Sequence, residues 1–220
     1  LENSSAELQK LVEEKEKLLH ETTEKAKKLS EYREKSAENF TRKVTAELEF
    51  LNMPDVSLKI RHEKGKLTLN GMDTMEILIS ANKGEEPKPV SKIASGGELS
   101  RIMLALKSIL AVRDSIPTMI FDEIDTGVSG KTAQKIGIKL REIGKVRQVI
   151  CVTHLSQIAV MADNHLLIEK NTINDRTETN VCQLDLNGRI AEIARIMGGE
   201  NPSKLMLENA EAEILKVKEL

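Results

Sequence analysis

Aromatic residues are nearly absent from this sequence. Its 220 residues include three Phe, one Tyr and no Trp. A core without large rings must be built from Leu, Ile, Val, Met and Ala, which suits helices and parallel strands. The scarcity also excludes the aromatic platforms on which bases of single-stranded nucleic acid stack.

The sequence also lacks a charge excess and a long apolar run. Its 33 basic and 35 acidic residues leave a net charge of -2, so no global positive field draws it to nucleic acid or an anionic membrane. Any DNA contact must be local or made by sequence outside this chain. No apolar stretch approaches the ~18 residues of a membrane span, and no secretory signal precedes the first helix. We therefore expect a soluble, cytoplasmic protein without a membrane partner.

Cysteine is scarce as well. Cys151 and Cys182 both lie in apolar runs that are predicted as strands, and no metal-ligand spacing relates them. We interpret them as buried thiols in a reducing cytosol.

Residues 1–52 are predicted to form a coiled-coil stalk. Neither Pro nor Gly occurs before Leu51, and the chain starts inside a charged helical pattern without an initiator Met, as expected of a trimmed segment. One heptad frame places apolar residues on the a and d positions: Leu1, Leu8, Leu11, Leu18, Leu29 and Tyr32. The same frame places polar residues there: Lys15, Thr22, Lys25, Ser36 and Asn39. The pairing should be weak and need its partner strand; the alternative is a solvated single helix.

Residues 53–220 are predicted to be globular, because Pro54 ends the helix. Two short strands and a third after an Asn70-Gly71 turn are expected first, at 56–60, 66–69 and 74–80. Strands at 118–121, 148–152, 165–170 and 177–186 then alternate with helices at 98–112, 131–143 and 156–161, and two helices at 190–197 and 202–218 close the chain. This alternation predicts an α/β fold in which helices flank a parallel sheet.

The run Ser95-Gly96-Gly97-Glu98 opens one of these helices. Free N–H groups and the positive end of the helix dipole attract an anion there, and the two glycines would let a phosphate approach the backbone. The alternative is an ordinary helix start capped by Ser95.

Two adjacent carboxylates, Asp122 and Glu123, end the apolar strand at 118–121. Open α/β sheets bind their ligands at the carboxyl ends of strands. One carboxylate can hold Mg²⁺ through water, and the next can orient or deprotonate an attacking water. We expect Asp122 to be the metal residue and Glu123 the base; an acidic strand end exposed to water is the alternative.

Two further residues follow strands. Asp125 lies in a Gly-rich loop and could reach a neighbouring active site, although a plain turn is an equal interpretation. His154 follows the strand at 148–152, where an imidazole can bind a terminal phosphate; an ordinary strand-end histidine is the alternative. The remaining histidines, His20, His62 and His165, are predicted to be surface residues.

In this order the four elements resemble the C-terminal half of an ABC-type ATPase head. The signature would lie at 95–98, Walker B at 118–123, the D-loop at Asp125 and the switch histidine at His154. A coiled coil running into the lobe ahead of the signature resembles the SMC-related branch. A narrower resemblance, to the RecN family of bacterial DNA-repair proteins, is carried by the runs 94–107, 120–130, 152–157, 162–166 and 193–199. Residues 1–50 match only in type, as the returning strand of that family's coiled coil.

The resemblance implies a catalytic arrangement and partners. Two heads would close around two ATP molecules with Mg²⁺, so that Ser95, Gly96 and Gly97 act on nucleotide held by a partner subunit. It implies a homodimer, the N-terminal half of the same head as a partner, and ATP-dependent action at DNA ends in double-strand break repair. Association with the nucleoid during repair follows from the same resemblance.

One element of the family pattern is missing. No Gly-x-x-x-x-Gly-Lys-Ser/Thr phosphate loop occurs in the sequence, and Gly130-Lys131 lacks the preceding spacing. That loop would lie in the N-terminal half, so we expect this chain alone to bind ATP poorly and not to hydrolyse it. A non-catalytic coiled-coil tether is an alternative function. An ABC transporter subunit is a weaker one, since the stalk precedes the signature and Ile124-Asp125 follow Glu123 in place of a proline or alanine turn.

Overall fold

A computed structural model describes residues 2–92, 96–111, 115–173 and 176–218. The chain divides into two compact units. We call residues 1–49 and 53–93 the stalk unit, and residues 50–52 and 94–220 the head unit. The strands that follow Pro54 therefore group with the long helix, whereas the sequence placed them in the globular region.

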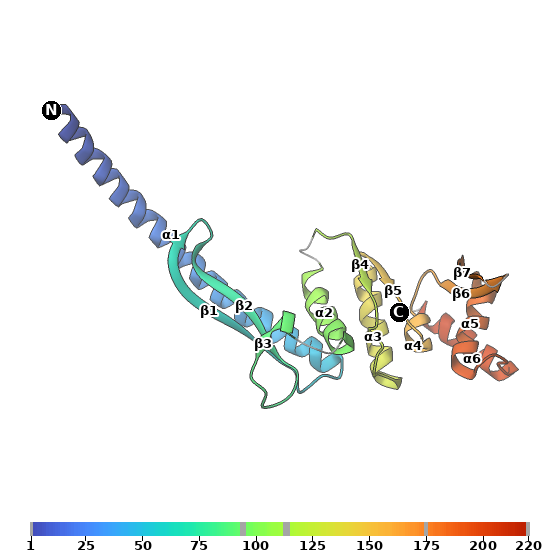
Figure 1. Ribbon diagram of the computed structural model, residues 1–220. Helices are drawn as coiled ribbons and strands as arrows, with labels where there is room; N and C mark the ends of the chain where they lie inside the picture. Colours follow the sequence, from blue (N-terminus) through green and yellow to red (C-terminus); the bar gives the residue numbers. More distant parts are fainter. Residues whose placement is uncertain (1, 93–95, 112–114, 174–175, 219–220) are drawn as a thin grey trace. The chain divides into compact units, whose positions relative to one another are not determined.

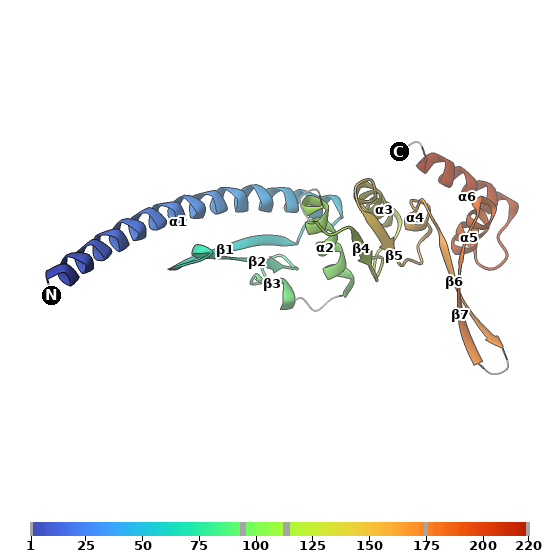
Figure 2. The same cartoon turned by 90° about the horizontal axis from the view of Figure 1, so that it is seen from above.

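The stalk unit is a long helix beside a β-hairpin. Helix α1 spans Glu2–Phe50 without interruption, as its lack of Pro and Gly predicts. Strands β1 (Ser57–Thr68) and β2 (Gly71–Ser80) pair antiparallel and run along α1 (Figures 1 and 2). The unit is completed by β3 (Lys88–Pro89), which pairs with β2, and a short 3₁₀ turn, η1 (Val90–Lys92).

The turn at Asn70-Gly71 is confirmed, and Gly71 has the positive φ of 100° that favours glycine. The two predicted strands before the turn are wrong in one respect: β1 is a single strand. Pairing continues through the charged stretch between them, where Glu63 lies opposite Thr74 and Lys64 opposite Asp73. The Glu63, Lys64 and Thr74 side chains are exposed, so their polarity does not prevent pairing, and the register shifts only between Lys64 and Thr68.

A buried polar cluster fastens the hairpin to the helix. The Asp73 side chain on β2 is fully buried; Arg33 of α1 donates to its Oδ1, and His62 Nε2 of β1 lies 2.7 Å from its Oδ2. The Ser30 hydroxyl of α1 lies 3.2 Å from the same His62 nitrogen. Burial raises the pKa of the Asp73 carboxyl, but hydrogen bonds from Arg33, His62 and Ser30 and the charge of Arg33 lower it further, so the net pKa is below its usual value. The prediction that His62 is a surface residue is wrong.

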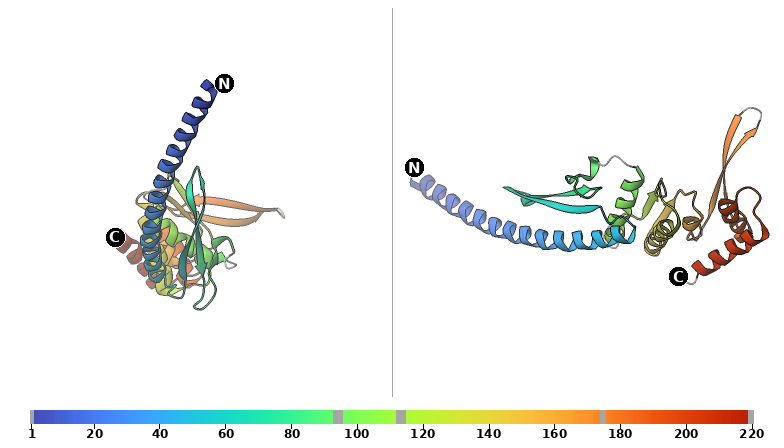
Figure 3. Two further views of the ribbon diagram at one scale, coloured as in Figure 1. Left: turned by 90° about the vertical axis from the view of Figure 1, so that its left-hand side faces the viewer. Right: turned by 90° about the horizontal axis from the view of Figure 1, so that it is seen from below.

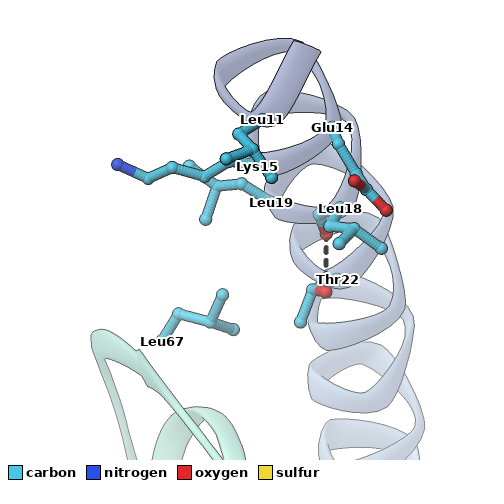
Figure 4. A pocket seen from close by; sticks show the side chains of 7 residues that line it. All are labelled: Leu11, Glu14, Lys15, Leu18, Leu19, Thr22 and Leu67. Carbon is cyan, nitrogen blue, oxygen red and sulfur yellow. Dashed lines mark hydrogen bonds between the residues drawn. The ribbon is translucent and has the colours of Figure 1, made fainter. Parts of the chain in front are cut away.

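The expected coiled-coil seam lies on the exposed surface of α1. Leu8, Leu11, Leu18 and Tyr32 are between 54% and 70% exposed, while Leu1 lies outside the described residues. Seam positions also line a hollow of about 450 Å³ that Leu67, near the hairpin turn, completes (Figure 4). Its lining residues are Leu11, Glu14, Lys15, Leu18, Leu19, Thr22 and Leu67. A lone helix gains nothing from this stripe of leucines, so the stripe favours a partner helix over the solvated alternative.

The head unit alternates helices and strands. Its elements are α2 (Gly96–Leu110), β4 (Thr118–Phe121), α3 (Gly130–Gly144), β5 (Gln148–Cys151), α4 (Ser156–Ala159), β6 (Leu166–Ile173), β7 (Arg176–Gln183), α5 (Leu186–Gly198) and α6 (Lys204–Val217). The predicted end of the first helix at Val112 lies outside the described residues. The N-cap residues Asp185 and Ser203 accept hydrogen bonds from Gly188 N and Met206 N, which fixes where α5 and α6 begin.

Strands β4 and β5 confirm the predicted parallel pair, in register from Thr118 opposite Gln148 to Phe121 opposite Cys151. Met119 and Phe121 are buried, and α3 contacts β5. On the other face, Ile120 and Ile150 lie side by side and are 70% and 43% exposed. An apolar sheet face of this kind is normally covered.

Strands β6 and β7 form a separate antiparallel hairpin and do not extend the parallel pair, as Figure 3 shows. One of its faces is apolar and exposed, at Leu166, Ile168 and Val181. Cys182 on β7 is also exposed, so its predicted burial is wrong, and Cys151 on β5 is partly buried.

The helices α4, α5 and α6 share a core of buried aliphatic residues that includes Met161, Ile193 and Ile214. His165, just before β6, is half-buried against this region. Burial and the charge of Arg189 lower the pKa of His165, with Glu192 opposing them. Its predicted surface position is therefore wrong. Among the helices that the structure describes, none combines the length and the apolar character needed to cross a lipid bilayer.

Candidate nucleotide site

The candidate site lies where β4 and β5 end together. The ladder runs one step past both strands, since Val152 N donates to Phe121 O at 3.0 Å. Asp122 and Glu123 follow β4, and Thr153 and His154 follow β5. The parallel register therefore brings two stretches about thirty residues apart in sequence to one edge of the sheet.

The two carboxylates after β4 are both exposed. Asp122 Oδ1 accepts the Glu123 backbone N–H at 2.9 Å, so the first carboxylate shapes the backbone of the second. Glu123 has a φ of 56°, in the left-handed region that non-glycine residues seldom occupy. A strained backbone at an exposed glutamate is typical of functional sites.

The start of α2 packs against this loop. A Cβ on Gly96 would lie 3.0 Å from Glu123 Oε2, and one on Gly97 would lie 2.9 Å from the backbone oxygen of Thr126. The first contact is with a flexible side-chain end, and the second is with fixed backbone. Gly97 is therefore required for packing, whereas Gly96 leaves the Glu123 carboxylate room. Ser95 lies outside the described residues, so its predicted role stays a prediction, and Glu98 is partly buried in the first turn.

Two residues of α2 anchor the same loop. Ser100 Oγ donates to Asp122 O at 3.2 Å, and the Arg101 guanidinium donates to Thr126 O at 3.0 Å. Burial lowers the pKa of Arg101, and the charge of Glu98 opposes that effect. Helix α2 and the loop after β4 are thus tied within one chain.

Asp125 is buried, at 4% exposed, and its carboxylate points toward the segment after β5. Its Oδ2 accepts the Thr153 hydroxyl at 2.6 Å and the His154 backbone N–H at 2.9 Å, and lies 3.1 Å from His154 Nδ1. The carboxylate thus points inward here, and the predicted reach of Asp125 into a neighbouring active site stays a prediction. The His154 side chain is 75% exposed, so its other ring nitrogen is open to a ligand.

The carboxylates of Asp125 and Asp122 also affect the pKa of the Cys151 thiol. Burial, followed by the charges of Asp125 and Asp122, raises the pKa of Cys151 to about 12. Cys151 is therefore protonated at neutral pH and is not a nucleophile.

Known proteins resemble this chain over most of its length. The DNA repair protein RecN of Haemophilus influenzae is 36% identical over 203 residues, and that of Bacillus subtilis is 38% identical over 232 residues. These matches cover 91% and 98% of this chain. The chain belongs to the RecN family. It spans 36% and 40% of the length of those two relatives, and a scan against models of protein families found no match.

Solved SMC heads share the fold of this RecN segment. A Smc head domain with a coiled coil and joint from Pyrococcus yayanosii aligns over 94% of this chain and 36% of its own, with a TM-score of 0.61. A Smc head from Pyrococcus furiosus aligns over 83% of this chain and 44% of its own, with a TM-score of 0.56. Both are 20% identical to it, so they establish the fold alone, which is that of a Smc head domain with a long helix.

The family resemblance implies Mg²⁺, and the residues present fit a partial site for that ion. Asp122 is exposed at the end of β4 and keeps a carboxylate oxygen beyond the one that accepts Glu123 N–H. Among the described residues no cluster of three or more His, Cys, Asp or Glu could hold a metal. A single carboxylate suits Mg²⁺, which takes most of its other ligands from phosphate and water.

Sequence reasoning did not assign roles to Ser100, Arg101 and Thr153, although each holds the site together. Arg101 had one visible signal, because its spacing places it on the same helix face as Gly97 and Ala105, which are both buried. Thr153 had none, since its partner Asp125 lies in a loop that follows another strand.

Proposed function

We propose that this chain is the C-terminal half of a RecN ATPase head, which acts as a dimer in ATP-dependent repair of DNA double-strand breaks. The observation that carries the proposal is the meeting of Asp122, Glu123 and His154 at the ends of two parallel strands. The RecN relatives, named DNA repair proteins, support the repair role.

Each residue has a task in the proposed reaction. Asp122 holds Mg²⁺, which neutralises phosphate charge when bound. Glu123 orients or deprotonates the attacking water, and the strained backbone at φ 56° aims its carboxylate. His154 contacts the terminal phosphate through its exposed edge. The signature residues Ser95, Gly96, Gly97 and Glu98 meet the nucleotide of a partner subunit.

The N-terminal half of the head would complete the fold and the site. Two apolar faces support this: Ile120 with Ile150 on the parallel pair, and Leu166, Ile168 and Val181 on the β6–β7 hairpin. Strands from the remainder of the protein would bury both faces and bring the phosphate loop that this sequence lacks. The chain alone then binds ATP poorly and does not hydrolyse it.

A coiled-coil tether without catalysis is the competing function, and the exposed seam on α1 favours it equally. The ATPase function and the tether function can be distinguished in cells that carry the full-length protein either as wild type or as Glu123→Gln. After double-strand breaks are induced, we expect Glu123→Gln cells to survive no better than cells without the protein. Wild-type survival with Glu123→Gln would remove ATP hydrolysis from the function and leave the tether.

A further inference from the structure

The contact between Asp125 and His154 specifies more than a folded loop. We propose that Asp125 is a positioning residue that holds the His154 ring with its proton on Nδ1 and its Nε2 edge facing the nucleotide. This rests on the proposed ATPase function, and it assigns the buried aspartate a task within its own chain.

One oxygen atom of Asp125 faces both the backbone and the ring of His154. Oδ2 accepts hydrogen bonds from the Thr153 hydroxyl and the His154 backbone N–H, and it lies 3.1 Å from the ring nitrogen Nδ1. A carboxylate oxygen offers only lone pairs, so it would repel an unprotonated Nδ1 at this distance, and the contact favours the ring with its proton on Nδ1.

The other edge of the His154 ring, at Nε2, is left for a ligand. When the proton on one nitrogen is fixed by a partner, the second nitrogen is left for the ligand. The Asp125 side chain is 4% exposed and the His154 side chain 75% exposed, so the ring is held at one edge and free at the other. A phosphate oxygen accepts hydrogen bonds, so its contact with Nε2 needs a second proton on the ring, and the Asp125 carboxylate balances that charge.

The loop that carries His154 is itself held by hydrogen bonds. Thr153 Oγ1 donates to Asp125 and accepts from Leu155 N at 3.1 Å, which places the His154 backbone between two restrained residues. Asp125 in turn lies in the loop that Arg101 holds through Thr126 O. The direction of the imidazole is therefore set by hydrogen bonds of the loop and by the Asp125 contact, and not by a ligand.

The test uses the ¹⁵N resonances of the ring nitrogens, which distinguish a protonated from an unprotonated nitrogen. The chain contains four histidines, so the spectrum of a His154→Gln variant assigns His154. In the wild-type chain we expect neutral His154 to carry its proton on Nδ1. In Asp125→Ala we expect the proton to move to Nε2, the nitrogen that an unconstrained imidazole prefers. Asp163→Asn, which changes an aspartate that is 82% exposed in the same unit, is the matched control and should leave His154 unchanged.

A second variant covers the case in which Asp125→Ala fails to fold. Asp125→Asn keeps the size and one acceptor, so it should retain the loop while losing the charge. In the full-length protein we expect Asp125→Asn to lower kcat for ATP about 10- to 100-fold with a small change in KM, as for other residues that orient a histidine. Asp125→Asn with wild-type kcat would overturn the proposal, and so would a wild-type ring protonated on Nε2. Because the NMR result needs no nucleotide, a protein with the expected tautomer and no ATPase activity would contradict the proposed function alone.

Discussion

Among the residues that the structure describes, each unit has an aspartate–histidine pair, and the two pairs differ in how exposed the histidine is. In the stalk unit the Asp73 side chain is 0% exposed and that of His62 17%, so both ends of the pair are occupied by the protein. In the head unit Asp125 is 4% exposed but His154 is 75% exposed. The same chemistry fastens a hairpin in one place and presents a ring to solvent in the other.

Under the proposed function, burial of the histidine, and not the presence of its carboxylate, separates the structural pair from the functional one. A buried charged pair is expensive to break, because the partner left behind remains desolvated. An exposed imidazole held by a buried carboxylate keeps its orientation while it exchanges water for a ligand. Substitutions in the two units should therefore affect different measurements.

The largest effect should come from exchanging the two histidines for asparagine one at a time. In the full-length protein we expect His154→Asn to lower ATP turnover by about 100-fold or more with little change in melting temperature. His62→Asn should leave turnover close to wild type and reduce the free energy of unfolding by about 2 kcal/mol, since a hydrogen bond to a charged group is lost. Steady-state kinetics and thermal denaturation of both variants check this. Equal changes in ATP turnover and in melting temperature for the two variants would contradict the distinction between the two pairs.

Asp73→Ala should give the next largest effect on stability. It leaves Arg33 and His62 without their buried partner, which costs about 3 kcal/mol of unfolding free energy. Denaturant unfolding of this chain measures the cost. Glu63→Ala, on the exposed edge of the same hairpin, is the control and should cost little. An equal loss from both variants would contradict the role of the buried cluster.

In the head unit, Gly97→Ala and Gly96→Ala should differ in their effect on the free energy of unfolding. A Cβ on Gly97 meets the Thr126 backbone, next to Asp125, so Gly97→Ala should cost about 1–3 kcal/mol by overpacking. Gly96→Ala meets only the end of the Glu123 side chain, which can move. Unfolding of the two variants in denaturant should place Gly96→Ala nearer to wild type, and the reverse order would show that the loop yields more easily than its packing suggests.

The stalk cluster should also respond to pH. The pKa of Asp73 is lowered in the folded chain from its ordinary value of 3.8, so its carboxylate contributes stability above pH 3.8. That contribution should be lost as pH falls below 3.8 through the folded pKa. Melting curves of wild type and Asp73→Ala between pH 6 and about pH 2 should therefore converge in acid. A constant gap between them would contradict the assignment.

The smallest effect is expected at Leu67, beside the hollow on α1. Leu67 is 37% exposed, so Leu67→Ser should barely change the stability of this chain. If a partner helix fills the hollow, the same change should weaken its binding by about 1 kcal/mol. Titration of a peptide from the preceding coiled-coil strand of the full-length protein, against wild type and Leu67→Ser, measures this. Equal affinities would show that the helix avoids the hairpin.

The elements with strong local patterns could be predicted from the sequence. Helix α1, the Asn70-Gly71 turn and the strand at Thr118–Phe121 are confirmed because spacing, turn chemistry and apolar runs determine them locally. Asp122, Glu123 and His154 were predicted because each ends an apolar strand, and parallel strands end at one edge.

The features that sequence reasoning missed depend on contacts between distant positions. His62 was expected at the surface, but its partner Asp73 is opposite β1 on β2 and Arg33 is on α1. The inward turn of Asp125 depends on Thr153, which is 28 residues away. The antiparallel pairing of β6 and β7 was missed because alternating helices and strands do not reveal a hairpin.

The most direct test of the central claim is ATP hydrolysis by this chain, by the N-terminal half of the full-length protein, and by the two produced together, with wild type or Glu123→Gln in each case. We predict turnover only when both halves are present, its loss in Glu123→Gln, and stimulation of the wild-type pair by linear DNA. Turnover by this chain alone, or turnover by the pair that survives Glu123→Gln, would contradict the assignment of this chain as half of a shared ATPase head.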